Sequence, residues 1–263
     1  MGLSVYIMTD LEGVSGVLLE AQTIQDGAAY ELARHWLTAE LNATIAGVFD
    51  AGVERVVAVD GHGKPFNFVY EELDERAEYI VGSGWEFYPE GAASVFDCAF
   101  CIGFHAMAGT PHAVLDHTMS SATWQNCWIN GQLVGELAIV AGVLGELGVP
   151  VTLVSGDDAT CSEARELLGP VETVVTKYGI SRHTAKLRAQ GPVLEELREK
   201  ARLAVTGRSK VSPLVFDVPV ELKIEYTKTA YADGLRSGLK ERPEPRMRLV
   251  KGETLGQAFL NLH

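Results

Sequence analysis

Short apolar runs without a polar interruption recur along this chain and alternate with helical stretches. The runs expected to be strands span residues 3–9, 55–59, 78–82, 98–103 and 151–155, and helical character is found at 28–50, 137–147 and 158–168. Strands that are apolar throughout are typical of parallel sheets with helices on both faces. We therefore predict an α/β fold, a three-layer sandwich around a largely parallel sheet.

The pattern changes after about residue 206. Residues 211–227 alternate in the period of two that indicates a half-buried strand. A short helix at 230–235, a strand at 247–250 and a helix from Glu253 are expected to follow. We predict an α/β core at 1–206 and a small α+β region at 207–263, with one domain that spans both as the alternative.

A hairpin is expected in the middle of the chain, apart from this alternation of strands and helices. Asn130 and Gly131 lie between apolar flanks in residues 127–134. An Asn-Gly pair in this setting is typical of a type I′ turn between two antiparallel strands.

The charge balance excludes several classes of partner. The chain has 22 Lys and Arg against 35 Asp and Glu, a formal net charge of −13. Nucleic-acid binding needs a basic stripe, and an anionic membrane would repel this charge. Four cysteines in 263 residues do not form a disulfide framework, and the first residues lack the basic segment of a signal peptide. We expect a cytoplasmic protein that binds neither nucleic acid nor membranes.

Acidic and histidine side chains follow three of the predicted strands. The first strand leads into Asp10 and Glu12, the second is followed by His62, and the strand at 98–103 by His105. In open parallel sheets, ligands bind at the carboxyl ends of the strands. These four side chains are therefore expected to converge at one edge of the sheet.

The residue types indicate a metal site. Two carboxylates and two imidazoles suit zinc or a similar divalent ion. The pair Asp116-His117 follows further along the chain, and Glu136 is expected to begin a helix. This set is larger than one structural zinc requires, and it suits a two-metal site with open positions for water and substrate.

Each of these signals has an ordinary interpretation when taken alone. Asp60-Gly61 is a turn signature, and an isolated loop histidine is commonly solvated. The remaining histidines receive that interpretation: His35, His112, His183 and His263. We interpret Cys98 and Cys101 as core thiols, because they lie in an apolar run and residues three apart in a strand point to opposite faces.

Motifs for nucleotide binding and for serine hydrolysis do not occur. Gly61-x-Gly63 lacks the third glycine and the following helix of the dinucleotide fingerprint. Ser15 does not have the glycine spacing of the G-x-S-x-G elbow, and no Walker A motif is found.

An ordered set of motifs resembles the M55 peptidases, a family of D-aminopeptidases. The motifs are Thr9-Asp10-Leu11-Glu12-Gly13, Asp60-Gly61-His62-Gly63, Gly103-Phe104-His105-Ala106, His117-Thr118, Asn130-Gly131 with Gly135-Glu136, Gly156-Asp157-Asp158 and Lys177-Tyr178-Gly179-Ile180-Ser181-Arg182. They cover about residues 3–190. Thr9 and Gly61 depart from the serines that the family pattern has there, but neither is a ligand position.

The resemblance implies a role for each matched residue. Asp10 would bridge two zinc ions, with Mn²⁺ or Co²⁺ as alternatives, and the other ligands would be Glu12, His62, His105 and Glu136. His117 would be the catalytic residue, as general base or as stabiliser of the tetrahedral intermediate. The implied reaction is removal of an N-terminal D-amino acid from a short peptide by metal-activated water. The implied assembly is a homo-oligomer such as a ring-shaped decamer.

Two other functions remain open from the residues. A two-metal phosphoesterase would use a similar ligand set, although Lys64 is the only cation near the strand-end motifs. A metal-binding protein without catalysis would have a closed ligand sphere. His117 is a further histidine beyond the ligands that such a sphere needs, which speaks against this function. Phosphate esters tested against short D- and L-peptides would separate these functions.

Overall fold

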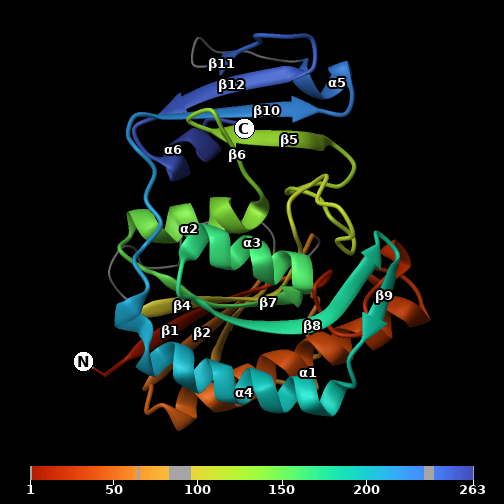
Figure 1. Cartoon of the computed structure of the whole chain (residues 1–263), viewed down its shortest axis with the longest axis vertical. Coiled ribbons are helices and arrows are strands. Elements are labelled where there is room, and N and C mark those ends of the chain that lie inside the picture. The colour runs from red at the N-terminus through yellow and green to blue at the C-terminus, as the bar shows by residue number, and fades with distance from the viewer. Residues whose placement is uncertain (1, 64–65, 83–95, 234–239, 263) are drawn as a thin grey trace.

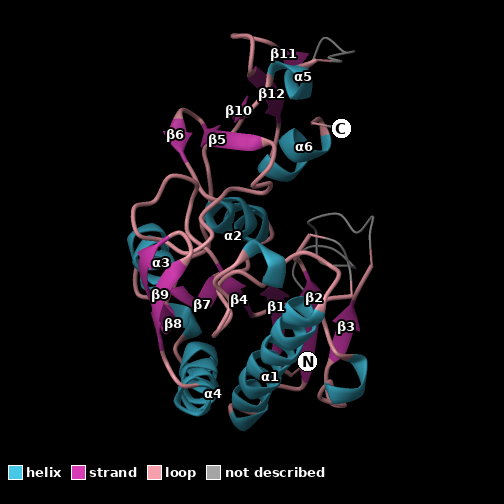
Figure 2. Ribbon diagram, turned by 90° about the vertical axis from the view of Figure 1, so that its right-hand side faces the viewer, coloured by secondary structure: helices cyan, strands magenta, loops and turns pink. Residues whose placement is uncertain are grey.

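Two sheets and the helices packed on them make up the structure (Figures 1 and 2). The computed structural model describes residues 2–63, 66–82, 96–233 and 240–262. The larger sheet has the strand order β3-β2-β1-β4-β7-β8-β9. Its strands are β1 (Ser4–Thr9), β2 (Arg55–Asp60), β3 (Glu78–Ile80), β4 (Cys98–Phe104), β7 (Val151–Asp157), β8 (Glu172–Ser181) and β9 (Thr184–Leu187). All neighbours pair in parallel except β8 and β9, which form an antiparallel hairpin.

Helices cover both faces of the larger sheet, which confirms the predicted three-layer sandwich. α1 (Ala28–Asp50) and α4 (Gln190–Thr206) pack on one face, and α2 (Glu136–Glu146) and α3 (Asp158–Leu168) on the other (Figure 1). One apolar cluster fills each interface. Cys98 and Cys101 are fully buried in different clusters, as their spacing in the strand predicted.

The smaller sheet is antiparallel and lies beyond α2. Its order is β11-β12-β10-β5-β6, formed by β5 (Trp124–Ile129), β6 (Gln132–Leu133), β10 (Val220–Tyr226), β11 (Lys240–Glu241) and β12 (Met247–Gly252). A third apolar cluster joins this sheet to α6 (Leu255–Leu260) and to the side of α2 that faces away from the larger sheet. Residues 137–145 of α2 are all buried, because this helix packs against both sheets.

The predicted Asn-Gly hairpin is confirmed. Asn130 and Gly131 have φ values of 50° and 82°, as a type I′ turn requires. The turn joins β5 to β6, and β5 pairs with β10. The smaller sheet therefore takes strands from both sides of the expected boundary at residue 206, and the division into two domains stays a prediction.

The structure differs from the predicted elements in several places. The strand expected at 211–227 begins only at Val220, because Pro213 and Pro219 lack the amide hydrogen of a ladder. α5 is the short helix Thr229–Ala232, and residues 234–235 of its predicted range lie outside the described residues. The β8–β9 hairpin, α4 and three 3₁₀ turns at 20–22, 70–72 and 208–210 were not predicted. Within the described ranges, no helix is both long and apolar enough to cross a membrane.

The contact between α1 and α4 gives a first prediction, for Gly47→Ala. A Cβ on Gly47 would lie 2.0 Å from the Arg198 carbonyl oxygen in α4. Alanine is favoured over glycine in a helix by about 1 kcal/mol, but the clash forces two packed helices apart. We expect a net loss of about 2 kcal/mol in the free energy of unfolding, measured by denaturant titration.

Gly191→Ala is the matched control, because Gly191 also lies in one of these two helices and a Cβ there would meet nothing within 4 Å. It should not lower stability. A Gly47→Ala protein as stable as the wild type would show that the two helices can separate without cost.

Candidate metal site

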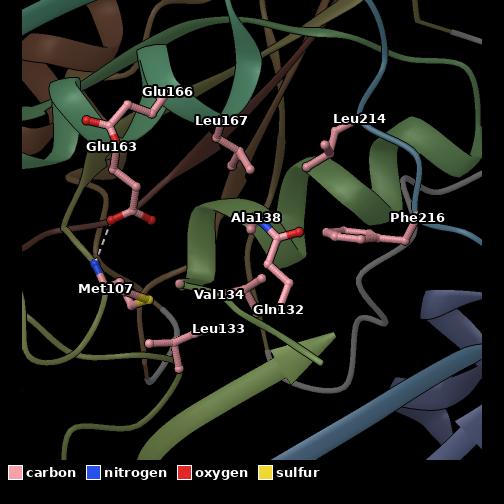
Figure 3. A pocket seen from close by; sticks show the side chains of 11 residues that line it. Met107, Gln132, Leu133, Val134, Ala138, Glu163, Glu166, Leu167, Leu214 and Phe216 are labelled. Atoms are coloured by element: carbon pink, nitrogen blue, oxygen red, sulfur yellow. Dashed lines mark hydrogen bonds between the residues drawn. The ribbon is translucent and has the colours of Figure 1, made fainter. Parts of the chain in front are cut away.

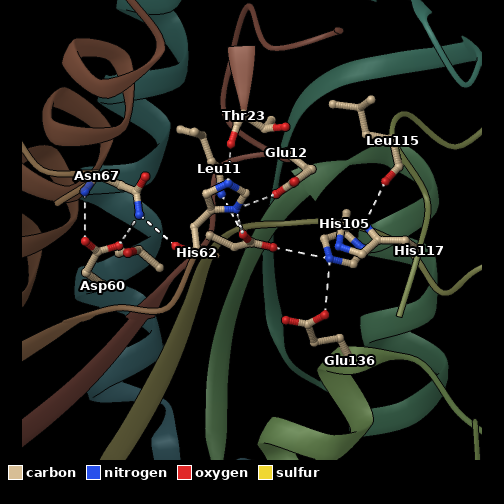
Figure 4. Close-up of polar contacts among 12 residues, drawn as sticks. Leu11, Glu12, Thr23, Asp60, His62, Asn67, His105, Leu115, His117 and Glu136 are labelled. Atoms are coloured by element: carbon tan, nitrogen blue, oxygen red, sulfur yellow. Dashed lines mark hydrogen bonds and ion pairs between the residues drawn. The ribbon is translucent and has the colours of Figure 1, made fainter. Parts of the chain in front are cut away.

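Three adjacent strands bring the predicted ligands to one edge of the larger sheet. β2, β1 and β4 are parallel neighbours, and Thr9 at the end of β1 pairs with Asp60 and Ile102. The residues that follow these strands therefore meet, as the sequence predicted. Figure 4 labels five members of the resulting cluster, Glu12, His62, His105, His117 and Glu136. The sixth is Asp10, which contacts both His62 and His105.

Two glycines allow the loop after β1 to touch the end of β4. A Cβ on Gly13 would lie 1.9 Å from the Phe104 carbonyl oxygen. Gly103 has φ of +75°, and a Cβ there would lie 2.2 Å from the Asp10 carbonyl oxygen. The amide of Gly13 also donates to the Gly103 carbonyl at 2.7 Å. Glycine at these positions lets the Asp10–Glu12 segment lie beside His105.

Asp10 lies between two histidines. Its Oδ1 is 2.8 Å from His62 Nδ1, and its Oδ2 is 3.3 Å from His105 Nε2. Glu12 Oε2 lies 3.1 Å from the same nitrogen of His62, and Glu136 Oε2 lies 3.5 Å from His105 Nε2. The His117 ring stacks on His105 with a centroid distance of 3.8 Å. The cluster thus alternates carboxylates and imidazoles.

Each histidine of the cluster uses one ring nitrogen to contact a backbone carbonyl. His62 Nε2 contacts Thr23 O at 2.8 Å, His105 Nδ1 contacts Ala106 O at 3.1 Å, and His117 Nδ1 contacts Leu115 O at 3.0 Å. A carbonyl only accepts, so these nitrogens carry the hydrogen in the neutral rings. Metal-binding histidines show this arrangement, with the second nitrogen left for the ion.

The remaining atoms of the cluster fit a divalent cation. Asp10 Oδ2, Glu12 Oε2 and His105 Nε2 are buried without a hydrogen-bond partner. Ligand atoms about 2.0–2.2 Å from a tetrahedral zinc ion are about 3.4 Å apart, close to the separations from His105 Nε2. Two sets can each converge on one ion: Asp10, Glu12 and His105, and His105, His117 and Glu136.

Without an ion, protons must compensate the carboxylates. Burial and the neighbouring Glu12 raise the pKa of Asp10 to about 7. Burial lowers the pKa of His105, but Glu136 and Asp10 outweigh this and raise it to about 10. Burial also lowers the pKa of His62, which Glu12 and Asp10 raise well above its ordinary value. Among the three histidines, His117 alone has a lowered pKa, because burial and the charge of His105 both disfavour its protonation.

Supporting contacts that the sequence did not reveal hold the turn that carries His62 and the side chain of Glu136. Asn67 Nδ2 donates to Asp60 Oδ1 and to the His62 carbonyl, both at 2.8 Å, so the turn Asp60–His62 is fixed from outside. Glu136 Oε2 accepts the Met119 amide at 2.7 Å. Asn67 belongs to no recognisable motif. Its role follows from the fold, in which the chain turns back so that Asn67 contacts Asp60.

The cluster opens into a cavity of about 380 Å³. The residues that line it include five members of the cluster, Asp10, Glu12, His62, His117 and Glu136, together with Thr23, Ile24, Met119, Ser120 and Ser121. This volume is in the range of small-molecule sites. The candidate ligands are thus accessible to a small substrate.

A second cavity of about 350 Å³ lies between α2, α3 and β6 (Figure 3). Glu163 on its wall accepts the Met107 amide at 2.8 Å, and burial raises the pKa of this carboxyl. Because Met107 follows His105 closely in the chain, this contact steadies the segment that carries a candidate ligand.

The other histidines lie away from the cluster, and so does the Asp116 side chain. His35 pairs with Glu72 on the surface, His112 contacts the Ile180 carbonyl, and His183 is exposed near Glu20. His263 and Lys64 lie outside the described residues. Asp116 accepts from Gly109 and Arg182 and not from the cluster.

Comparisons with known proteins agree with this geometry. The family model for M55 peptidases, described as D-aminopeptidase, matches residues 3–244. A D-aminopeptidase of Bacillus subtilis (strain 168) is 35% identical over 233 residues, 88% of this chain and 84% of the relative. The solved structure of the Zn-dependent D-aminopeptidase DppA from Bacillus subtilis, a self-compartmentalizing protease, has a TM-score of 0.92 and 30% identity, and the match covers 99% of this chain and 96% of that one. This chain therefore belongs to the M55 family of D-aminopeptidases.

Proposed function

We propose that this protein is a zinc-dependent aminopeptidase that removes N-terminal D-amino acids from short peptides with a binuclear metal centre. The observation that carries the proposal is the cluster itself, in which buried carboxylate oxygens face imidazole nitrogens that have no other partner. The descriptions of the relatives, a D-aminopeptidase and a Zn-dependent D-aminopeptidase, supply the reaction and the ion.

Grouped by their ion pairs, the ligands would form two groups that share Asp10, whereas the two sets described above share His105 and include His117. Its two oxygens face different histidines, Oδ1 toward His62 and Oδ2 toward His105. Glu12 lies on the His62 side and Glu136 on the His105 side. This arrangement supports Asp10 as a bridge between two ions, with Mn²⁺ and Co²⁺ as alternatives to zinc.

The chain's own residues would bind the peptide and move a proton. Bound zinc ions would supply Lewis-acid polarisation of the scissile carbonyl and lower the pKa of water. His117 keeps Nε2 free because Nδ1 is held by the Leu115 carbonyl, and its lowered pKa leaves that nitrogen ready to accept a proton. It lines the cavity together with Met119 and Ser120, so it can reach a reacting group.

The two alternative functions are less well supported. The described residues that line this cavity include no lysine or arginine, which a phosphoesterase would use to bind the phosphate charge. A non-catalytic metal site would be closed, whereas these ligands border an open cavity.

We also propose that the chain assembles into a closed homo-oligomer, such as a ring-shaped decamer, in the cytoplasm. Support comes from the similarity to a protein described as self-compartmentalizing. The four cysteines are buried free thiols, as a reducing compartment favours. Light scattering of the purified protein would give the mass of the assembly.

The first functional prediction concerns the substrate. Purified protein is expected to contain zinc and to hydrolyse dipeptides with an N-terminal D-Ala faster than those with an N-terminal L-Ala. Metal analysis and chromatography of the released amino acids measure the two results. A protein without bound metal that cleaves neither peptide would contradict the proposal, and turnover of phosphate esters alone would favour the phosphoesterase.

A second prediction separates ligand from proton carrier. His105→Ala should lose metal and activity together, because His105 Nε2 faces both Asp10 and Glu136. His117→Ala should keep the metal but lower kcat by about 10²–10⁴-fold, the usual effect of removing a general base. His35→Ala, on the surface of α1, is the control and should change neither. Metal loss in His117→Ala would make His117 a ligand instead.

A third prediction concerns protons released on metal binding. In the metal-free protein the pKa of His105 is about 10, so below that pH an ion must displace a proton. Apparent affinity should therefore rise about tenfold per pH unit for each proton released between pH 7 and pH 9. Calorimetry in buffers of different ionisation enthalpy measures this release. Affinity that does not change over this range would contradict the assignment of His105.

A further inference from the structure

Two neighbouring side chains of β8 bind three consecutive carbonyl groups of the loop that carries Glu12. Lys177 Nζ donates to Glu12 O at 2.6 Å and to Val14 O at 2.8 Å. Thr176 Oγ1 lies 2.6 Å from Gly13 O and 3.0 Å from Gly156 O, and we assign its one hydrogen to the shorter contact, with Gly13. Both side chains are fully buried, and they lie more than 160 residues away from the loop in sequence.

The same loop is held from the other side by α1. Glu40, which is also fully buried, accepts the Ser15 amide through Oε1 at 2.8 Å. The amide of Gly13 donates to the Gly103 carbonyl oxygen in β4. The backbone from Glu12 to Ser15 is thus fixed by contacts from β4, β8 and α1, so the Glu12 carboxylate has little freedom except at its own side-chain torsions.

A buried lysine is a costly donor, because its charge must leave water. Buried Asp157 and Glu40 have stronger electrostatic interactions with Lys177 than Glu12 and Asp10 have. The charge of Lys177 is therefore compensated mainly by groups outside the ligand cluster. The main effect of Lys177 on the ligand loop is to hold two of its carbonyl groups in place through two strong hydrogen bonds.

We infer that Lys177 and Thr176 are positioning residues that set the affinity of the metal site by fixing the backbone of Glu12. This inference rests on the proposed metal centre. Residues that orient ligands in this way commonly change metal affinity by 10–100-fold when they are replaced. A purely structural role would instead lower stability and leave the affinity of the folded protein unchanged.

The test compares Lys177→Met with Lys200→Met. Methionine keeps the length of the lysine chain and removes its donors and its charge. Lys200 in α4 is the matched control. Its Nζ donates to Glu172 Oε2 at 2.6 Å, and Glu172 lies at the start of β8, away from the ligand loop. We expect Lys177→Met to bind Zn²⁺ about tenfold or more weakly in competition with a chromophoric chelator, and Lys200→Met to bind as the wild type does.

Thr176→Val is the second variant, and it decides the question if Lys177→Met does not fold. It keeps the shape of the side chain and leaves Gly13 O without its donor, so it should also weaken Zn²⁺ binding. The absorption spectrum of the Co²⁺-loaded variants should shift, since it reports ligand geometry directly. Unfolding temperatures of the metal-free proteins separate these effects from a loss of stability.

The outcomes are distinct. Folded variants that bind Zn²⁺ with wild-type affinity and show an unchanged Co²⁺ spectrum would overturn the inference and leave the metal centre intact. Tighter Zn²⁺ binding by Lys177→Met would also overturn the inference. It would show that repulsion between the Lys177 charge and the ion matters more than the hydrogen bonds that fix the loop. A wild-type protein that binds no Zn²⁺ would overturn the proposed function as well.

Discussion

Three parallel strands end side by side in the larger sheet, and the arrangement of the site depends on that alignment. β2, β1 and β4 are neighbours, so the segments that leave them must share a small volume. The close contact at Gly13 and Gly103 reduces that volume further, since no side chain separates the two loops. Carboxylates and imidazoles brought together in this way cannot all be satisfied by one another. Their unpartnered atoms are a direct consequence of the strand order.

Much of this arrangement could be predicted from the sequence. Runs of apolar residues indicate buried parallel strands, and the polar residues that follow such strands belong at the carboxyl edge of the sheet. That reasoning is enough to bring Asp10, Glu12, His62 and His105 together. Glu136 and His117 were harder to place, because they follow loops and a hairpin. Their residue types placed them in the candidate set, and the motif resemblance gave them their roles.

The supporting contacts could not be predicted in the same way. Asn67 and Glu40 are ordinary polar residues in the sequence, and Lys177 would normally be assigned to the surface. Each acts through a contact with a distant segment, and single-sequence patterns describe only near neighbours. The β8–β9 hairpin was missed because the buried residues of β8 do not alternate with a period of two and most side chains of β9 are exposed. α4 has a helical period, with Val193, Leu197 and Ala201 buried, and could have been predicted.

The path of the chain through the smaller sheet has a consequence for how the protein matures. Between His105 and Glu136 the chain leaves the larger sheet, forms β5 and β6, and returns as α2. β5 cannot pair with β10 until almost the whole chain has been synthesised. The side of α2 that packs on the smaller sheet cannot be covered before then. Such distant pairings form slowly, because a long loop must close first. We therefore expect the chain to acquire its full set of candidate ligands late, when its last strands join the sheet.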